Sequence, residues 1–129
     1  MSITPTDLLG LAAQLAAASD ATEVSYRGAV SRAYYAAYHD SDVWHSQLPV
    51  PGFLPAQFAG GMHSQLCHRL ANPDATLHAD RKVRSKQRGY VLKVLHALRI
   101  CSDYELSEVV GAEDSQQAIS DAQKIIALN

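Results

Sequence analysis

The stretch RAYYAAYH, from Arg32 to His39, combines a charged and a titratable side chain with dense apolar and aromatic residues. Successive residues of an α-helix are rotated by about 100°, so a step of seven returns His39 to within about 20° of Arg32, two turns along the helix. Tyr35 lies between them on the same face. The stretch therefore predicts a helix that is apolar on most sides and carries one polar stripe.

The residues on either side extend this helix from about Thr22 to His45. Its apolar residues are not confined to one face, and a helix of this kind is normally buried at the centre of a protein. The small alanines would let neighbouring helices approach closely, while the tyrosines would fill the wider gaps. We therefore expect residues 22–45 to form the core helix of a bundle. The apolar positions on its main side and flanks are Tyr26, Val30, Ala33, Tyr34, Ala37, Tyr38 and Trp44.

The rest of the chain also carries helical patterns, and Val, Ile and Thr alternation is scarce. Helices are expected over Thr4 to about Ser19, Thr22 to His45, Met62 to Leu70, Asp80 to Tyr104 and Ala112 to Leu128. Three prolines and three glycines between Ser46 and Gly61 predict a long loop, and a linker is expected around Ser107 to Gly111. The fold predicted for residues 1–129 is all-α, a single domain built as a four- to five-helix up-and-down bundle.

The two longest later helices should each bury one apolar side. On the fourth helix the buried side is expected to hold Val83, Tyr90, Val91, Val94, Leu95, Leu98 and Cys101. On the fifth, the stripe is Ala118, Ile119, Ala122, Ile125 and Ile126. The start of the first helix, Thr4 followed by Pro5 and Asp7, is similar to a capping box.

Composition and charge set limits on the class of protein. The chain has 129 residues, a hydrophobic fraction of 47% and a net charge of −2, so overall charge alone would not bind nucleic acid. No apolar run reaches the roughly 20 residues that cross a bilayer, and no membrane partner is expected. Cys67 and Cys101 lie within helical patterns and there is no signal-peptide pattern, which favours a reduced, cytoplasmic compartment.

Basic residues nevertheless gather in one segment. Between Arg81 and Arg99 lie seven of the eleven lysines and arginines, with no acidic residue among them. Such a run would hold RNA phosphates through salt-dependent contacts that are largely independent of base sequence. The residues expected to bind RNA are Arg81, Lys82, Arg84, Lys86 and Arg88.

The run from Ser31 to His39, together with a basic helix that ends in Ser102-Asp103-Tyr104, resembles the HEPN domain, a helical-bundle family named for higher eukaryotes and prokaryotes nucleotide-binding. The run is similar to the family's Arg-x-Tyr-Tyr-Ala-x-aromatic-His pattern, with six residues between arginine and histidine. The resemblance covers nearly the whole chain. It implies a homodimer in which Arg32 and His39 of both subunits meet in one cleft, with a toxin-like role and an antitoxin or nucleotidyltransferase as a possible partner.

In active members of that family the cleft is a metal-independent endoribonuclease site, and the residue types here suit this chemistry. Histidine, with an unperturbed pKa of about 6.5, can exchange a proton near neutral pH to activate a ribose 2′-hydroxyl or protonate the leaving oxygen. Arginine offers a permanent, fork-shaped cation for the scissile phosphate. Arg32 and His39 are therefore the expected catalytic pair. Tyr35 could bind the phosphate or orient His39, and Asp42 could fix the tautomer of His39.

Other functions fit parts of the same sequence. The first alternative is a catalytically silent HEPN-fold dimer that binds RNA, a nucleotide or a protein partner. It is favoured by Ala33, because active relatives often have a polar residue directly after the arginine. The second is a helical adaptor that docks through its segregated charges. His63, Cys67 and His68 lack the ligand count of a structural zinc site, so neither a metal nor a cofactor is expected. His45, His78 and His96 are assigned to surface or capping roles.

Overall fold

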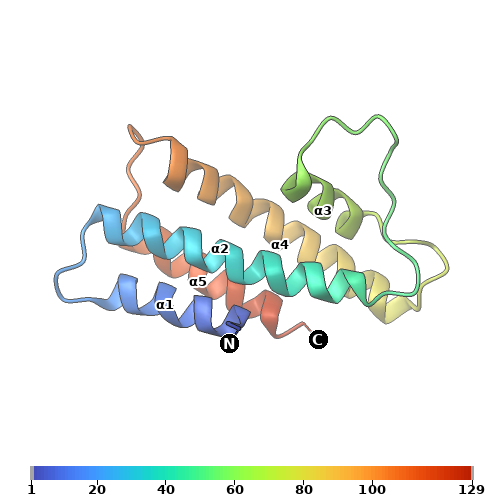
Figure 1. Ribbon diagram of the computed structural model, residues 1–129, viewed down its shortest axis with the longest axis horizontal. Coiled ribbons are helices and arrows are strands. Elements are labelled where there is room, and N and C mark those ends of the chain that lie inside the picture. Colours follow the sequence, from blue (N-terminus) through green and yellow to red (C-terminus); the bar gives the residue numbers. More distant parts are fainter. Residues whose placement is uncertain (1, 129) are drawn as a thin grey trace.

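The computed structural model describes residues 2–128, and this part of the chain folds into five helices without a strand (Figure 1). All five expected helices agree with the prediction to within two residues at each end, and the all-α prediction is confirmed. The first helix ends two residues before Ser19. The helices are α1 (Pro5–Ala17), α2 (Glu23–Ser46), α3 (Met62–Ala71), α4 (Ala79–Tyr104) and α5 (Ala112–Ile126). None of them, within the described residues, is both long and apolar enough to cross a membrane.

Helix α2 lies at the centre of the bundle. It packs against α1, α5 and α4, whereas α3 packs mainly on α4 and forms a separate short layer beside the long loop (Figure 1). Val30 and Tyr34 are fully buried, and three of the alanines in the opening stretch are also at 0% exposure. The alanines bring the neighbouring helices close to α2, and Tyr34 fills the space between α2, α3 and α4. The predicted core helix is confirmed.

Helix ends are fixed by local hydrogen bonds. The backbone nitrogen of Asp7 donates to Oγ1 of Thr4, and the Thr4 nitrogen donates to Oδ2 of Asp7 over 2.8 Å, so the predicted capping box is present. At the start of α4, Nδ1 of His78 accepts from the nitrogen of Asp80 over 3.3 Å. The capping role expected for His78 is confirmed. Each cap satisfies a backbone donor that the first turn would leave unpaired.

The predicted buried side of α4 is partly wrong. Val83, Tyr90 and Val94 are exposed by 54%, 74% and 47%, whereas Ser85 and Gly89 are buried. The cause is the close approach of α3, since a Cβ atom on Gly89 would lie 2.9 Å from the backbone nitrogen of Ala71. Small residues are required on the side that faces α3, and the large apolar ones are turned outward. An apolar periodicity could not reveal this rotation, because small residues carry little hydrophobic signal.

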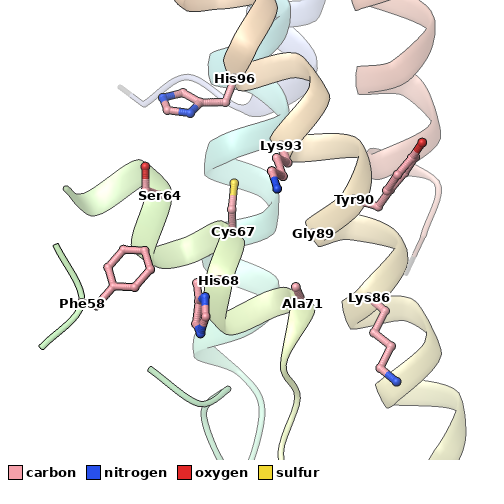
Figure 2. Close-up of a pocket in the computed structure, with 10 residues that line it drawn as sticks. All are labelled: Phe58, Ser64, Cys67, His68, Ala71, Lys86, Gly89, Tyr90, Lys93 and His96. Carbon is pink, nitrogen blue, oxygen red and sulfur yellow. The ribbon is translucent and has the colours of Figure 1, made fainter. Parts of the chain in front are cut away.

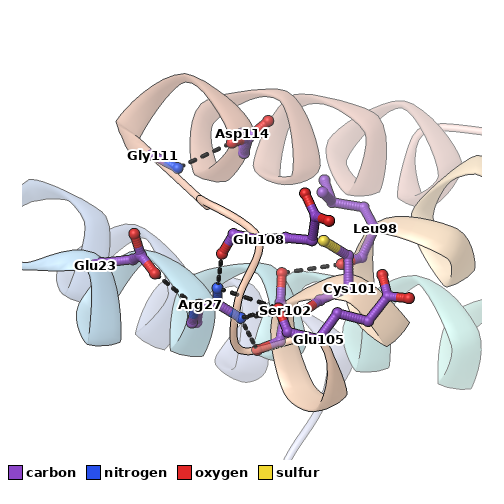
Figure 3. Close-up of polar contacts among 9 residues, drawn as sticks. All are labelled: Glu23, Arg27, Leu98, Cys101, Ser102, Glu105, Glu108, Gly111 and Asp114. Carbon is purple, nitrogen blue, oxygen red and sulfur yellow. Dashed lines mark hydrogen bonds and ion pairs between the residues drawn. The ribbon is translucent and has the colours of Figure 1, made fainter.

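A buried arginine joins the beginning of α2 to the end of α4 (Figure 3). The Arg27 guanidinium donates to the carbonyl oxygens of Ser102 over 2.9 Å and Cys101 over 3.1 Å, and also to those of Glu105 and Glu108. Its Nε is paired with Glu23 over 3.0 Å. The last carbonyl groups of a helix lack partners within the helix, and Arg27 satisfies several at once. This fixes the end of α4, and the turn after it, against α2.

Hydrogen bonds at Gly52 hold the loop between α2 and α3. The nitrogen of Gly52 donates to Nε2 of His45 over 3.0 Å, and its carbonyl oxygen accepts from Arg69 over 2.9 Å. A Cβ atom at Gly52 would lie 1.9 Å from the carbonyl oxygen of Arg69, so only glycine fits there. His45 thus has a loop-anchoring role that the sequence did not indicate. The anchor sets the path by which the loop returns to α3.

Candidate functional site

Arg32 and His39 stand out by their exposure. From Ala29 to Ser41 they are the two exposed residues of α2, and the other residues of that stretch are buried or half-buried. Within the described part of the chain, the Arg32 side chain makes neither a hydrogen bond nor an ion pair. The polar stripe predicted from the seven-residue spacing therefore reaches the surface. It presents a guanidinium and an imidazole that are free to contact a ligand.

His39 belongs to a set of packed rings, which we call the tyrosine–histidine cluster: Tyr34, Tyr35, Tyr38 and His39 from α2, His63 from α3 and His96 from α4. The rings of Tyr35 and His39 stack with centroids 6.1 Å apart and an angle of 27°. His63 and His96 stack more closely, at 5.6 Å and 11°. The ring centroids of Tyr38 and His63 are 4.4 Å apart. The cluster joins α2, α3 and α4, and it holds the rings that contact His39.

An arginine from α4 is attached to the edge of the cluster. Arg99 donates from a terminal nitrogen to the hydroxyl of Tyr35 over 2.8 Å, and its guanidinium carbon lies 5.1 Å from the centre of the Tyr35 ring. Its Nε is paired with Oδ2 of Asp103 over 2.8 Å, and the same oxygen accepts from Oγ of Ser31 over 3.2 Å. The Tyr35 ring is thereby held between Arg99 and His39. Tyr35 therefore lies where the sequence placed it, beside His39.

The buried part of the cluster is uncharged. Burial lowers the pKa of His63 below its ordinary value, and the nearby His96 and Arg99 lower it further. Burial and Arg99 also lower the pKa of His96. Desolvation raises the pKa of Tyr34, so this phenol keeps its proton, and its hydroxyl shares a hydrogen bond with Nδ1 of His63 over 2.6 Å. The rings of His63 and His96 pack against each other as neutral groups at neutral pH.

These shifts predict a pH dependence of stability. The pKa values of His63 and His96 are depressed in the folded state, so below about pH 6.5 the unfolded chain binds protons first. The free energy of unfolding should therefore fall as the pH decreases from about 7.5 to 5. Urea unfolding at a series of pH values measures the slope. The variant His63→Phe should show a shallower slope, and His78→Gln, at an exposed cap, should match the wild type. An unchanged slope in His63→Phe would contradict this role of His63.

Two other predicted features of the site turn out differently. Asp42 makes no hydrogen bond to His39 within the described residues, and it lines a small groove with Tyr38 and His45 instead. It therefore does not fix the tautomer of His39 in this structure. Ala33 is fully buried and faces the core, so the residue after the arginine does not share the exposed face of Arg32. Its small size serves helix packing.

The basic residues of α4 divide into two groups. Arg81, Arg84 and Lys86 are exposed and Lys82 is half-buried, so these four remain candidates for RNA contacts. The prediction for Arg88 is wrong, because its side chain is fully buried and paired with Asp40 over 2.8 Å. Position 88 lies on the same side of α4 as Ser85 and Leu92, which face the core. A guanidinium enclosed there cannot reach a phosphate on the surface.

Three residues of the site were missed from the sequence. His63, His96 and Arg99 come from α3 and α4 and meet α2 through contacts separated by 29 to 64 residues, as the Tyr34–His63 and Tyr35–Arg99 hydrogen bonds show. His96, which was expected in a surface or capping role, is half-buried, and its ring also packs against Tyr34 and His63. The sequence did contain one signal for this part of the site: His96 precedes Arg99 by three residues, and residues at i and i+3 share a helix face.

The cysteine near this site is inert as an acid. Burial raises the pKa of Cys67 to about 11, so its thiol stays protonated at neutral pH. Among residues 2–128, histidine, cysteine and carboxylate side chains form no group of three that could hold a metal ion.

Comparisons of the chain with known protein families, curated proteins and solved structures found no match. The function must therefore be inferred from the residues of the site.

Proposed function

We propose that this protein is a metal-independent endoribonuclease of the HEPN type, with Arg32 and His39 as its catalytic pair. The observation that carries the proposal is their exposure: on a helix otherwise covered by its neighbours, these two side chains reach solvent on one face. An exposed arginine without an intramolecular partner has its five donors available for a phosphate. An exposed histidine two turns along the same face can exchange protons with solvent and substrate.

Arg32 would bind the scissile phosphate. During RNA cleavage negative charge accumulates on the non-bridging oxygens of the phosphorus, and a guanidinium can donate to two of them at once. The contact strengthens as charge develops, so it stabilises the transition state more than the ground state. The Tyr35 hydroxyl accepts from Arg99 and its ring stacks on His39, so Tyr35 would orient His39 while its O–H can still donate to the phosphate.

His39 would act in the proton transfers of the cleavage reaction. The ribose 2′-oxygen forms a bond to the adjacent phosphorus while the bond from phosphorus to the 5′-oxygen breaks. The 2′-hydroxyl loses a proton to a base, and the departing 5′-oxygen gains one from an acid. The products are a 2′,3′-cyclic phosphate and a 5′-hydroxyl end. This path needs no metal, because the guanidinium and the two proton transfers supply the charge compensation.

A homodimer would complete this site. Two proton transfers are served best by two histidines, and a second subunit placed against the same face of α2 supplies His39 of the partner subunit. Apolar side chains close to this face support the arrangement: Val43, one turn after His39, is 55% exposed, and Met62, beside Asp42, is 71% exposed. Burying such side chains between subunits would be favourable. The pairing would also place two Arg32 guanidinium groups around one phosphate.

RNA would also be held by α4, on the side of His39 toward the end of α2. Arg81 and Arg84 line a groove with Trp44, near the end of α2 that follows His39. Lysines and arginines there would contact flanking phosphates, so affinity would fall as salt rises. A cytoplasmic toxin or phage-defence role, with an antitoxin or nucleotidyltransferase as partner, fits an enzyme that cuts RNA with little base preference.

The proposal is tested by incubating RNA with the purified protein in excess chelator. The wild type and His78→Ala should cut the RNA, whereas His39→Ala should not. His78 is the matched control, because it is an exposed histidine at the start of α4, away from the site. Cutting by all three variants alike would contradict the role of His39. Salt-sensitive RNA binding without any cutting would instead support the catalytically silent HEPN-fold alternative.

A further inference from the structure

A groove of about 610 Å³ runs between α3 and α4 (Figure 2). One wall is formed by Phe58 of the loop with Cys67 and His68 of α3, and the other by Lys86 and Lys93 of α4. The remaining lining residues are Ser64, Ala71, Gly89, Tyr90 and His96. Gly89 forms the floor, where the two helices touch most closely. The volume lies within the range of small-molecule sites in proteins.

The lining has a clear chemical character. It includes two lysines and two histidines, and no lining residue among those described is acidic. Lys86 and Lys93 are seven residues apart and lie on one face of α4, and Figure 2 shows Lys93 directed into the space between the helices. Phe58 packs on His68 with ring centroids 5.0 Å apart and an angle of 52° between the rings, which holds an aromatic ring on the opposite wall. A ligand suited to both walls carries a negative charge and a planar ring.

A chain of ring contacts links the groove to His39. His96 lines the groove and also stacks on His63, which in turn lies 6.0 Å from Tyr35 in the tyrosine–histidine cluster. Tyr35 stacks on His39. The groove and His39 thus lie at two ends of one cluster, and we infer that an RNA strand lying across His39 could place another of its nucleotides in the groove. Bases of a duplex are stacked and paired, so a base can enter the groove only from a single strand.

We propose that the groove between α3 and α4 binds one nucleoside monophosphate unit of single-stranded RNA, with its base on Phe58 and its phosphate at Lys93. The inference rests on the proposed function for the identity of the strand. It adds a substrate class, namely single-stranded RNA, and two binding residues outside the catalytic pair. Lys86 would contact the next phosphate along the strand.

The test measures binding of a fluorescein-labelled six-nucleotide oligoadenylate to the His39→Ala protein, in which cleavage cannot interfere. Added to this background, Phe58→Leu removes the ring but keeps an apolar side chain, and should weaken binding about tenfold. Phe58→Trp keeps a ring and should bind as the background does. Lys93→Gln should reduce the slope of log affinity against log salt by about 0.7. Lys124→Gln, an exposed lysine on α5, removes the same charge and should leave the slope unchanged.

The assignment would be overturned if Phe58→Leu bound the oligonucleotide as tightly as the background does. It would also be overturned if Lys93→Gln and Lys124→Gln reduced the salt slope equally. In a second arm, unlabelled AMP competes with the labelled oligonucleotide. Competition that depends on Phe58 and Lys93 supports a groove that also takes a free nucleotide, whereas a lack of competition supports a site for the strand. Thermal unfolding verifies that each variant is folded. Because binding is measured without cleavage, failure of the ribonuclease proposal and failure of this one give different results.

Discussion

Arg32→Ala is expected to lower the rate of RNA cleavage by about 10²- to 10³-fold, the usual cost of removing one donor that stabilises transition-state charge. The fold should be unaffected, because Arg32 is exposed and makes no intramolecular hydrogen bond or ion pair in the part of the chain that is described. Arg32→Lys should retain part of the activity, since an ammonium supplies charge but cannot form a two-pronged contact. Single-turnover cleavage of a short RNA measures the effect.

Arg84→Ala is the matched comparison for this variant. Arg84 is also an exposed arginine, and its proposed role is to bind flanking phosphates rather than the scissile one. It should raise KM and leave kcat close to that of the wild type, whereas Arg32→Ala should lower kcat. If both variants changed KM alone, Arg32 would be one more RNA-binding residue and not part of the catalytic pair.

Arg88→Ala is expected to cost about 3–5 kcal/mol of folding free energy, because it removes one partner of a buried ion pair. Arg88 is fully buried and donates to Asp40 over 2.8 Å and to the carbonyl oxygen of Leu128 over 3.0 Å. Its guanidinium also lies 4.9 Å from the centre of the Trp44 ring. The variant would lose contacts to α2 and to the C-terminal end of the bundle, and would leave the Asp40 carboxylate without its partner.

Urea unfolding measures this loss, with Arg84→Ala as the control on the exposed side of the same helix. Arg84→Ala should be within about 0.5 kcal/mol of the wild type, as surface substitutions usually are. Adding Asp40→Asn to Arg88→Ala should recover part of the stability, because the remaining partner then carries no charge. Equal midpoints for Arg88→Ala and the wild type would show that the buried pair contributes nothing to the fold.

Much of the fold was predictable from local signals. Thr4 with Asp7 marks the start of α1, and the prolines and glycines after Ser46 mark the long loop. The dense apolar residues around Tyr34 correctly identified the central helix. These signals depend on residues close together in the chain. They are strong when the periodicity is long and the caps are clear.

The orientation of α4 could not be predicted in the same way. Its apolar residues suggest one buried side, yet Val83 and Tyr90 face outward and Arg88 faces the core. The packing is decided by the close contact of Gly89 with Ala71 and by the ion pair of Arg88 with Asp40. Both are contacts between distant segments. A run of basic residues is normally read as an exposed surface, and only the structure separates the buried arginine from its neighbours.

The candidate site was predictable in part for the same reason. Arg32, Tyr35 and His39 lie on one helix, so their spacing alone places them on one face. His63 and Arg99 join them through tertiary contacts, and no spacing in the chain relates those residues to α2. The hydrogen bond that Tyr35 accepts from Arg99 is likewise a tertiary contact that the spacing on α2 does not indicate.

The central claim is that Arg32 and His39 cut RNA through attack by the ribose 2′-hydroxyl without a metal. The most direct measurement compares two RNA oligonucleotides in excess chelator, one all-ribose and one with a single 2′-deoxynucleotide on the 5′ side of the main cleavage position. We predict that the wild type cuts the first, leaving a 2′,3′-cyclic phosphate and a 5′-hydroxyl, and leaves the second intact at that position. Cutting at the 2′-deoxy position, or loss of all cutting in chelator, would contradict the account.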